Sequence, residues 1–508
     1  MNRILILVVL ALLQINVLAA EQRINIQVLN EKLQNQGATW YAKDNWLNQL
    51  PKEDLQRMMG LRETPAQDAE FVVPESSIKT KGNLPTVHDW RDYRGQNWVS
   101  PMLNQANCGS CVAFASIGVL ETQVNISSLI PQLNRRLSPQ FLFSCGGGAC
   151  NWGWMPESAS RFLMKKGTTD EACLPYTSGA TGNDVSCKAA CSDSSQRSQK
   201  IAGYTTPSRS ARNITAVKQA LLKGPVMTTL TVYSDFITYG GGVYKRSSKE
   251  ALGGHAVSIV GYDDSKNAWI IRNSWSEDWG DHGFGYVDYD DDSGISDSTW
   301  LFNVPAIDGY VSTINPHSYS YMTGVTQFDG TSSYAKTDSL QFNVYGDSGK
   351  ISATQSCRSS QCSAQVDTTQ LSDGRYEIET LALNSAGNEI ARSSRDFFYV
   401  INSEPNMSLS FKGAQGVDLS KPLKGRVEFD IVAESSPVPM SSLEFHIVDI
   451  NGKENIRHSD IVLSKMTLGW RTPLVPNGTY TIYLTGKISA DGFERTVESA
   501  QYSIEVKN

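Results

Sequence analysis

Three patterns of hydrophobic and polar residues follow one another along the chain. Between residues 21 and 83, "EKLQNQGATWYAKDNWLNQLPKEDLQRMM" carries apolar residues at roughly helical intervals, which predicts a partly helical segment. Residues 84 to about 307 contain "VAFASIGVLETQV", a run that is hydrophobic on nearly every side and predicts a buried helix. The same region then turns to short β patterns, "HAVSIVGYD", "AWIIRNSW" and "GFGYVDYD". We therefore expect an α+β region whose helices precede its strands.

Beyond about residue 308 the chain changes to short alternating runs separated by Gly, Ser and Asp. One set is "SLQFNVYG", "RYEIETLAL" and "DFFYV", and a second is "RVEFDIVA", "LEFHIVDI", "TYTIYLTG" and "QYSIEV". Two stretches of roughly a hundred residues each fit two all-β sandwich domains, at 308–402 and 403–508. "DGRYEIETLALNSAGNE" and "NGTYTIYLTGKISADGFE" look like successive copies of one unit and resemble immunoglobulin-like or fibronectin-like modules.

The amino end has the pattern of a secretory signal peptide. Arg3 supplies the positive start, "ILILVVLALL" the apolar middle and "VLAA" the small-residue end, so we expect residues 1–20 to be removed. No other long apolar run follows, which predicts a mature form without a membrane span. The predicted location is secreted: extracellular or periplasmic, or a lysosome-like compartment in a eukaryote.

Composition narrows the class of partner. The 508 residues carry a formal charge of only -7, and no Lys/Arg stripe is present, which argues against nucleic acid as a partner. Export places the chain where thiols tend to pair, yet its nine cysteines are an odd number. At least one thiol is therefore left over or bonded to another chain.

The stretch "NQANCGSCVAF" places Cys108 and Cys111 three residues apart. Taken alone, this spacing fits a redox pair, a structural disulfide partner or a catalytic nucleophile; half a zinc site would need a second pair of ligands, and no second CxxC exists. "GGHAVSIVGYD" then offers His255 at the start of a predicted strand, and "IIRNSWSEDWG" offers Asn273 at the end of the next. A cysteine nucleophile needs a base, and that base needs a group to orient its ring.

Together these residues resemble the papain family of cysteine peptidases, whose His and Asn lie roughly 130–150 residues beyond the Cys. Asn273 lies slightly farther on, as a loop insertion would explain. The likeness spans residues 84–307 and is strongest to cathepsin C, in "LPTVHDWRDYRGQNWVSPMLNQANCGSC", "LSPQFLFSC" and "EACLPYTSGATGNDVSC". It implies a two-lobed fold, with a helical lobe and a β-barrel lobe.

The resemblance assigns roles to individual residues. Cys111 is the nucleophile and His255 its base, Asn273 orients the imidazole, and Trp275 shields that hydrogen bond from water. The Gln105 side-chain amide and the Cys111 backbone N–H form the oxyanion hole.

The same resemblance implies the disulfides and the substrate subsites. It pairs Cys108 with Cys150, Cys145 with Cys187 and Cys173 with Cys191; Cys357 and Cys362 are close in sequence and are expected to close a local loop. Cys111 is then the free thiol. The family's "CNGG" is "CNWG" here, so Gly153 is expected to bind substrate backbone and Trp152 either to cover the third subsite or to serve in packing. Ser298 aligns with the floor of the second subsite.

The segment 21–83 resembles the short pro-region of cathepsin B, in the pattern formed by Trp40, Ala42 and Asn45. The implied protein is a cysteine endopeptidase made as a zymogen, inhibited by its own pro-region, acting on protein or peptide substrates and needing no cofactor or metal. The β modules are expected to bind a surface, a glycan or a protein, or to act as spacers. Two alternatives stay open, a catalytically inactive binding protein of this fold and a secreted disulfide oxidoreductase using CGSC.

Overall fold

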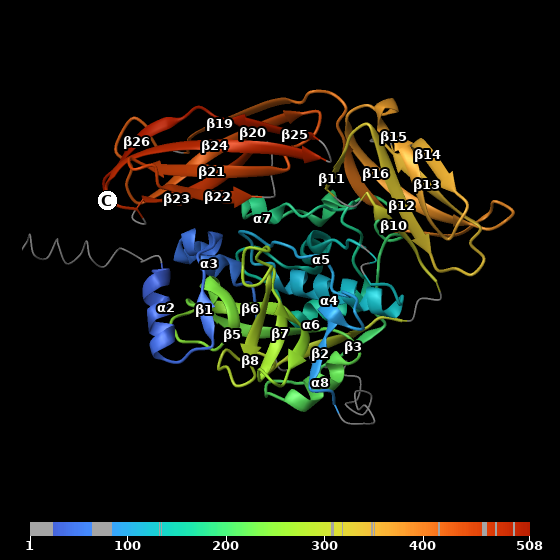
Figure 1. Cartoon of the computed structure of the whole chain (residues 1–508), viewed down its shortest axis with the longest axis horizontal. Coiled ribbons are helices and arrows are strands. Elements are labelled where there is room, and N and C mark those ends of the chain that lie inside the picture. Colours follow the sequence, from blue (N-terminus) through green and yellow to red (C-terminus); the bar gives the residue numbers. More distant parts are fainter. Residues whose placement is uncertain are drawn as a thin grey trace, which may run out of the picture.

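The computed structural model describes residues 24–62 and 84–508, except for short gaps at 132, 134, 306–308, 317–318, 347–348, 350, 415–416, 460–464, 473–474 and 491–492. The expected signal peptide, residues 1–20, lies outside the described residues. Two β-sandwiches lie along one side of a larger α+β body (Figure 1). The fold class predicted from the sequence is confirmed.

The body has a helical lobe built around one buried helix. The helices of this lobe are α4 (Cys111–Ser127), α5 (Pro139–Gly146), α6 (Pro156–Lys165), α7 (Ser178–Thr181) and the 3₁₀ turn η5 (Cys187–Ala189). Nearly every side chain of α4 is buried, as its uniformly apolar sequence predicts. The Ser138 hydroxyl accepts from the Phe141 N–H and begins α5, and proline stands in the first turn of both α5 and α6.

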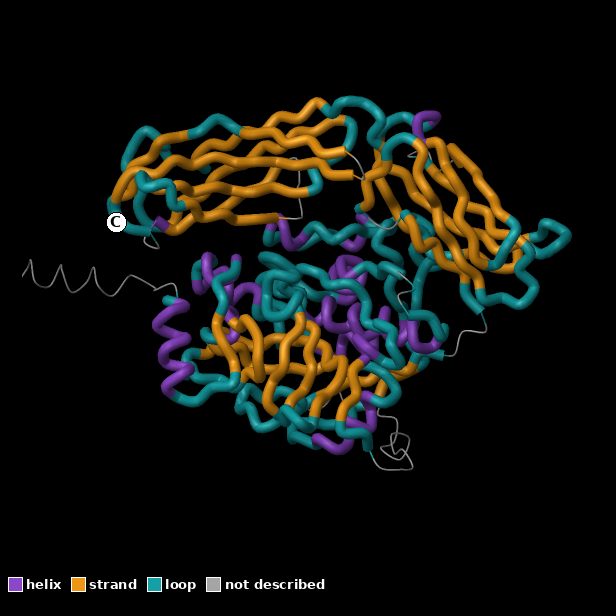
Figure 2. Tube along the Cα trace, viewed as in Figure 1, coloured by secondary structure: helices purple, strands orange, loops and turns teal. Residues whose placement is uncertain are grey.

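The second lobe of the body is a nine-stranded sheet in the order β1-β5-β8-β7-β6-β4-β9-β3, with β2 paired to β6. Its strands are β1 (Trp40–Ala42), β2 (Val87–Asp89), β3 (Gly203–Thr205), β4 (Val226–Tyr233), β5 (Tyr239–Tyr244), β6 (Ala251–Asp263), β7 (Ala268–Arg272), β8 (Phe284–Asp288) and β9 (Thr299–Asn303). The short helices beside them are η4 (Trp90–Asp92), α8 (Ile214–Leu221) and η6 (Phe236–Thr238). In Figure 2 the strands of the body form one group, with α2 (Ile26–Asn35) at its left, α8 below it and the helices of the helical lobe above it.

Residues 24–62, here called the leading segment, pack against the β lobe. The segment contains α2 (Ile26–Asn35), β1, η1 (Trp46–Gln49) and α3 (Lys52–Met58). β1 pairs antiparallel with β5, and the Trp40 indole N–H donates to the Lys245 carbonyl at 3.0 Å. Asn45 caps η1 and donates to the Ile237 carbonyl at 2.8 Å. The partly helical prediction is confirmed for these residues.

The first β-sandwich consists of a three-stranded and a six-stranded sheet. Its elements are β10 (Val311–Asn315), β11 (Ser320–Met322), β12 (Val325–Ser332), β13 (Ser339–Tyr345), β14 (Ile351–Cys357), β15 (Gln361–Asp367), η7 (Thr368–Gln370), β16 (Gly374–Leu383), β17 (Glu389–Arg392) and β18 (Asp396–Val400). Phe328, Phe342 and Phe398 pack between the two sheets. Alternating inward residues thus supply one core.

The second β-sandwich consists of a three-stranded and a five-stranded sheet. Its strands are β19 (Asn406–Gly413), β20 (Arg426–Ser436), β21 (Ser442–Asp449), β22 (Glu454–Ser459), β23 (Lys465–Arg471), β24 (Gly478–Ala490), β25 (Phe493–Glu498) and β26 (Tyr502–Val506). Phe411, Phe429, Phe445 and Trp470 form its aromatic core. Each sandwich has a hydrophobic core of its own.

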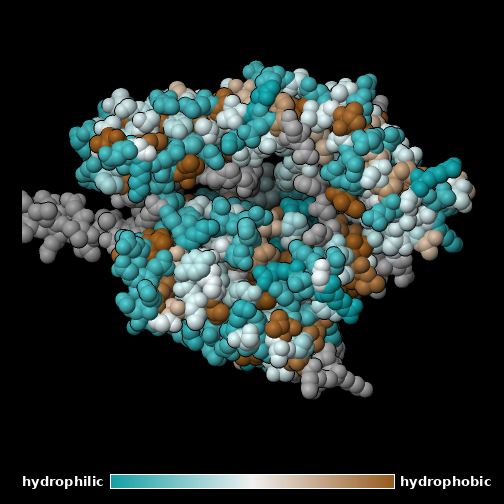
Figure 3. Space-filling view, viewed as in Figure 1, coloured by the Kyte–Doolittle hydropathy of each residue, from teal (hydrophilic) through white to brown (hydrophobic). Residues whose placement is uncertain are grey.

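The second sandwich lies over the body, on the side of α7 and η1. β23 lies against α7, and β22 lies against η1 of the leading segment (Figure 1). A hollow separates much of this sandwich from the body below it (Figure 3). The two sandwiches meet through a small apolar cluster that includes Tyr321, Val438 and Ile488. Within the described residues, no helix has the length and apolar character needed to cross a membrane.

Candidate active site

The two cysteines of CGSC differ in their bonding: one forms a disulfide and the other is free. Cys108 is bonded to Cys150, which leaves Cys111 as the free cysteine of the described chain. The remaining bridges are Cys145–Cys187, Cys173–Cys191 and Cys357–Cys362, the pairs expected from the sequence. A redox pair of Cys108 with Cys111 is therefore contradicted by this structure.

Cys111 is the first residue of α4, where unpaired backbone N–H groups and the helix dipole favour negative charge on sulfur. Its side chain is fully buried. α4 packs across β6, where the Ser258 hydroxyl donates to the Ala115 carbonyl at 3.2 Å. The Ala256 backbone lies close enough to the Cys111 thiol to act on its pKa, which places the neighbouring His255 beside the thiol.

His255 and Asn273 form a hydrogen-bonded pair under an indole ring. His255 Nε2 lies 2.8 Å from Asn273 Oδ1, and the Ser274 backbone N–H donates to that same oxygen at 2.9 Å. Because this oxygen accepts both bonds, Nε2 carries the imidazole proton and Nδ1 keeps its lone pair. Nδ1 is buried and has no hydrogen-bond partner within the described structure. The Trp275 ring stacks on the imidazole at 4.5 Å and covers the pair.

Gln105 is oriented by three contacts of its own. Its side-chain oxygen accepts from the Ser274 hydroxyl at 2.7 Å, and its backbone N–H donates to the Ser274 carbonyl at 2.9 Å. The side-chain amide nitrogen is thereby directed toward the loop that carries Cys111, where it donates to the Cys108 carbonyl at 3.0 Å. This is the orientation required of an oxyanion donor.

The leading segment occupies the site. The Gln105 amide also donates to the Met58 carbonyl at 2.9 Å, and the Gly60 backbone lies close enough to the Cys111 thiol to act on its pKa. Beyond Gly60 the segment runs parallel to the chain at Trp154, whose N–H donates to the Gly60 carbonyl at 2.7 Å. Leu61 donates its N–H to the Gly254 carbonyl at 3.1 Å and packs against the cluster that contains Cys111 and Trp154.

Burial keeps both reacting groups neutral in this arrangement. It raises the pKa of the Cys111 thiol to about 11, against weaker hydrogen bonds from Ala256 and Gly60. It lowers the pKa of His255 to about 4, and the hydrogen bond to Asn273 acts in the opposite direction. At pH 7 the thiol therefore keeps its proton and the imidazole stays uncharged.

The predicted subsite residues lie in different surroundings. Trp152 is 69% exposed, so it does not serve in packing, and Arg62 of the leading segment lies over its ring at 5.1 Å from the centroid. Gly153 has a φ of +71°, and a Cβ there would lie 2.0 Å from the Gly60 carbonyl oxygen. Ser298 is half-buried, and its hydroxyl accepts from the Ser210 backbone N–H at 3.2 Å, within the β lobe.

Several residues of the site were not identified from the sequence. Ser274, which fixes Gln105, stands between two predicted site residues in "NSW" and could have been found there. Met58 and Gly60 carry no motif of their own, because they contribute backbone groups. Among the described residues, no group of three or more His, Cys, Asp or Glu could hold a metal ion.

Comparison with known proteins places this site in the matched part of the chain. A sequence model described as papain family cysteine protease matches residues 84–301. Cathepsin B-like CP2 of Giardia intestinalis is 35% identical over 224 residues, which cover 43% of this chain and 73% of that protein. Cathepsin B-like CP3 of the same organism is 37% identical over 223 residues, covering 42% and 71%. The solved structure of digestive procathepsin L2 from Tenebrio molitor larval midgut has a TM-score of 0.48 and 25% identity, covering 55% of this chain and 89% of its own.

Proposed function

This chain belongs to the papain family of cysteine proteases, and on that premise we propose that it hydrolyses peptide bonds through Cys111, His255 and Asn273. The observation that carries the proposal is the hydrogen bond between His255 Nε2 and Asn273 Oδ1, from which we infer the tautomer of His255. Asn273 holds the proton on Nε2, which leaves the Nδ1 lone pair to act as a base next to the free thiol of Cys111.

The reaction proposed is acyl transfer through a thioester. The proton of the Cys111 thiol passes to His255 Nδ1, and the sulfur attacks the peptide carbonyl. The Gln105 amide and the Cys111 backbone N–H bind the oxyanion, and Ser274 keeps the Gln105 amide turned toward it. The C–N bond breaks as His255 returns its proton to the leaving amine. Water activated by the imidazole then hydrolyses the thioester and regenerates the thiol.

We infer that the full chain is a zymogen and that residues 21–83 are its inhibitory pro-region. The Met58 carbonyl takes the Gln105 donor that an oxyanion would use, and Gly60 covers the thiol. The parallel bridge between Leu61 and Trp154 holds the segment across the site.

Secretion and endopeptidase action are further parts of the proposal. The pattern of residues 1–20 supports export, and the bridges within residues 84–307 suit an oxidising compartment. Residues 58–62 cross the site as a continuous stretch of chain, which supports cleavage within a chain. The proposed units are a peptidase at 84–307 and two sandwiches at 308–402 and 403–508, with the tail modules directed at a surface, glycan or protein.

The test is hydrolysis of an internally quenched peptide by the processed protein. We expect hydrolysis by the wild-type protein while its Cys108–Cys150 disulfide remains oxidised. We expect this hydrolysis to be lost in Cys111→Ala and in His255→Ala. The matched control is Ser258→Ala, which removes a hydroxyl from the same strand as His255 without touching the reacting groups.

Two outcomes would favour the alternatives. A folded, processed protein without hydrolytic activity would favour a binding protein of this fold. Reduction of a disulfide substrate, lost in both Cys108→Ala and Cys111→Ala, would favour an oxidoreductase.

A further inference from the structure

A buried tyrosine, Tyr176, contacts both ends of the loop 105–110, which leads to the nucleophile. The Tyr176 hydroxyl donates to the Gln105 carbonyl at 2.7 Å and lies 2.7 Å from the Ser110 hydroxyl. Its ring meets Phe114 of α4 edge to face at 4.7 Å. Gln105 supplies the oxyanion donor, and Ser110 directly precedes the nucleophile. Tyr176 therefore helps to set the distance between the Gln105 amide and the Cys111 thiol, the two groups that must act on one substrate carbonyl.

Tyr176 is in turn held by a buried carboxyl group. One oxygen of Glu171, Oε1, accepts from the Tyr176 backbone N–H at 2.8 Å. Glu171 is 4% exposed, and its other oxygen, Oε2, has no hydrogen-bond partner within the described structure. Burial raises the pKa of this carboxyl group to about 7. All of its bonds are thus concentrated on the oxygen that faces Tyr176.

The second donor to this oxygen comes from the first β-sandwich. The Tyr319 hydroxyl donates to Glu171 Oε1 at 2.9 Å. Tyr319 has a φ of +68°, a conformation that costs a bulky residue energy and persists only when its surroundings enforce it. The ring of Tyr319 is partly exposed and packs edge to face on Phe397 at 4.7 Å. Its hydroxyl points toward the body, where it donates to Glu171.

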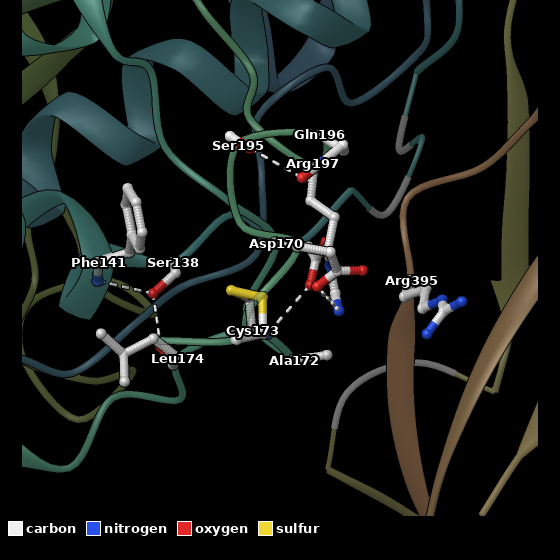
Figure 4. Close-up of a disulfide and its surroundings, with 12 residues drawn as sticks. Ser138, Phe141, Asp170, Ala172, Cys173, Leu174, Ser195, Gln196, Arg197 and Arg395 are labelled. Carbon is white, nitrogen blue, oxygen red and sulfur yellow. Dashed lines mark hydrogen bonds and ion pairs between the residues drawn. A yellow bond between two sulfur atoms is a disulfide. The ribbon is translucent and has the colours of Figure 1, made fainter. Parts of the chain in front are cut away.

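Other contacts hold the loop of Glu171 from both sides. Asp170 pairs with Arg197 and accepts from the Cys173 N–H, next to the Cys173–Cys191 bridge (Figure 4). Arg395 of the first sandwich is also drawn in Figure 4, but its ion pairs are with Glu377 and Glu379 of its own domain. Arg375, also on this sandwich, donates to the Ala172 carbonyl at 3.2 Å. The loop is therefore shared between the two domains.

We propose that Tyr319 is a positioning residue of the peptidase site: by binding Glu171 it fixes Tyr176, and Tyr176 holds Gln105 and Ser110 in register. This inference rests on the proposed peptidase function. It makes the first sandwich a structural part of the active site. A sandwich that served as a spacer alone would not influence the rate.

The experiment compares Tyr319→Phe, Tyr176→Phe and the double variant in the full, processed chain. We expect Tyr319→Phe to lower kcat about fivefold, with KM unchanged, because couplings of this kind are modest. Affinity for a peptide aldehyde, which forms an oxyanion on Cys111, is expected to fall by the same factor. Because the two tyrosines act in series, the double variant should be no slower than Tyr176→Phe.

Tyr321→Phe is the matched control. Tyr321 lies two residues away, and its hydroxyl donates to the Pro439 carbonyl at 3.1 Å, between the sandwiches and away from Glu171. It should keep the wild-type kcat. As a readout independent of turnover, hydrogen exchange at the Tyr176 amide should be faster in Tyr319→Phe and unchanged in Tyr321→Phe.

Three results would overturn the inference. They are a wild-type kcat in Tyr319→Phe, an equal loss in Tyr321→Phe, and losses that multiply in the double variant. If the wild-type chain cleaves no peptide, the proposed function fails instead, so the two failures are distinguishable.

Discussion

At the scale of single residues, the site is latent because the same burial acts in opposite directions on an acid and a base. The Cys111 thiol keeps its proton up to a pKa of about 11, and His255 takes one up only near 4. Neither the thiolate nor the imidazolium is populated between these values. When processing removes Met58 and Gly60, solvent reaches the site. The N-terminus of α4 then becomes the main influence on the pKa of the Cys111 thiol.

The first prediction concerns the reactivity of Cys111 in the unprocessed chain. Because the raised pKa makes thiolate scarce, alkylation by iodoacetamide should accelerate about tenfold per pH unit between pH 6 and 9. The processed chain should instead react at a rate that changes little over this range. Mass spectrometry of Cys111 after timed labelling measures both. A flat profile in the unprocessed chain would contradict the neutral thiol.

The second prediction concerns Trp152. Arg62 lies over its exposed ring, so we expect a basic side chain to be favoured at the third substrate residue before the cleaved bond, where the family resemblance places Trp152. We expect the processed protein to prefer Arg over Ala there by about two- to fivefold in kcat/KM, as exposed cation–π contacts allow. Trp152→Ala should abolish this preference, and Trp152→Phe should keep part of it. A preference that survives in Trp152→Ala would assign it to other residues.

Residues that carry motifs could be predicted, and residues that act through their backbone could not. Cys111, His255 and Asn273 stand in sequences whose chemistry is visible in the side chains themselves. Met58 blocks the site with a carbonyl oxygen, a group that every residue has. Tyr176 and Glu171 are ordinary buried residues until folding brings Tyr319 beside them.

At the scale of elements, the leading segment inhibits by close backbone contact. Where Gly60 crosses the site, a Cβ would lie 1.8 Å from the Gly109 carbonyl oxygen and could not be accommodated without displacing that backbone. Gly153 faces the segment from the opposite side with the same restriction. Two glycines thus allow the segment to lie flat over the thiol.

The third prediction follows from this contact. Gly60→Ala should raise the activity of the unprocessed chain about tenfold, because overpacking of this kind costs about 1–3 kcal/mol. Gln56→Ala, at an exposed position of the same segment, is the control and should leave the latency unchanged. Initial rates on a fluorogenic peptide, taken before processing, give the comparison. Equal latency in both variants would argue against inhibition at Gly60.

Elements with a clear period were predicted well. The uniformly apolar helix α4 and the strands β6, β7 and β8 lie where their sequences indicate. The strands β10, β12 and β15 of the first sandwich were not identified, because β10 and β12 are rich in polar residues and the inward residues of β15 are mostly small. Only pairing with each other reveals them as one sheet, and pairing is a property of the folded chain.

At the scale of the whole molecule, the second sandwich restricts approach to the body. β23 lies against α7, and this contact does not involve the leading segment, so it should persist after processing. The contact of β22 with η1 is lost when the segment leaves. The space that opens is then bounded by the body on one side and by the sandwich on the other.

The fourth prediction is a preference for extended chains. The quantity to measure is the rate of cleavage of a reduced, unfolded protein divided by the rate for the same protein in its folded state. We expect this ratio to be at least about tenfold larger for the processed full-length protein than for a papain-family enzyme without such modules. The comparison enzyme is the control for the intrinsic resistance of the folded substrate. Equal ratios for the two enzymes would show that the sandwich does not limit access.

The domain arrangement was beyond prediction from the sequence for a physical reason. Several contacts between the first sandwich and the body are polar, such as those of Ser312 with Leu133 and of Arg375 with Ala172. Such residues have the same pattern as an exposed surface. The presence of two β-sandwiches, by contrast, was predicted from the alternating strands.

We propose that one free thiol, that of Cys111, is the nucleophile for peptide hydrolysis and that His255 activates it. The most direct measurement is labelling of the processed protein with a peptide epoxide, followed by mapping of the modified residue. We expect a single label on Cys111 that is abolished in His255→Ala. Peptide hydrolysis that continues without any label at Cys111, or labelling that is unchanged in His255→Ala, would contradict it.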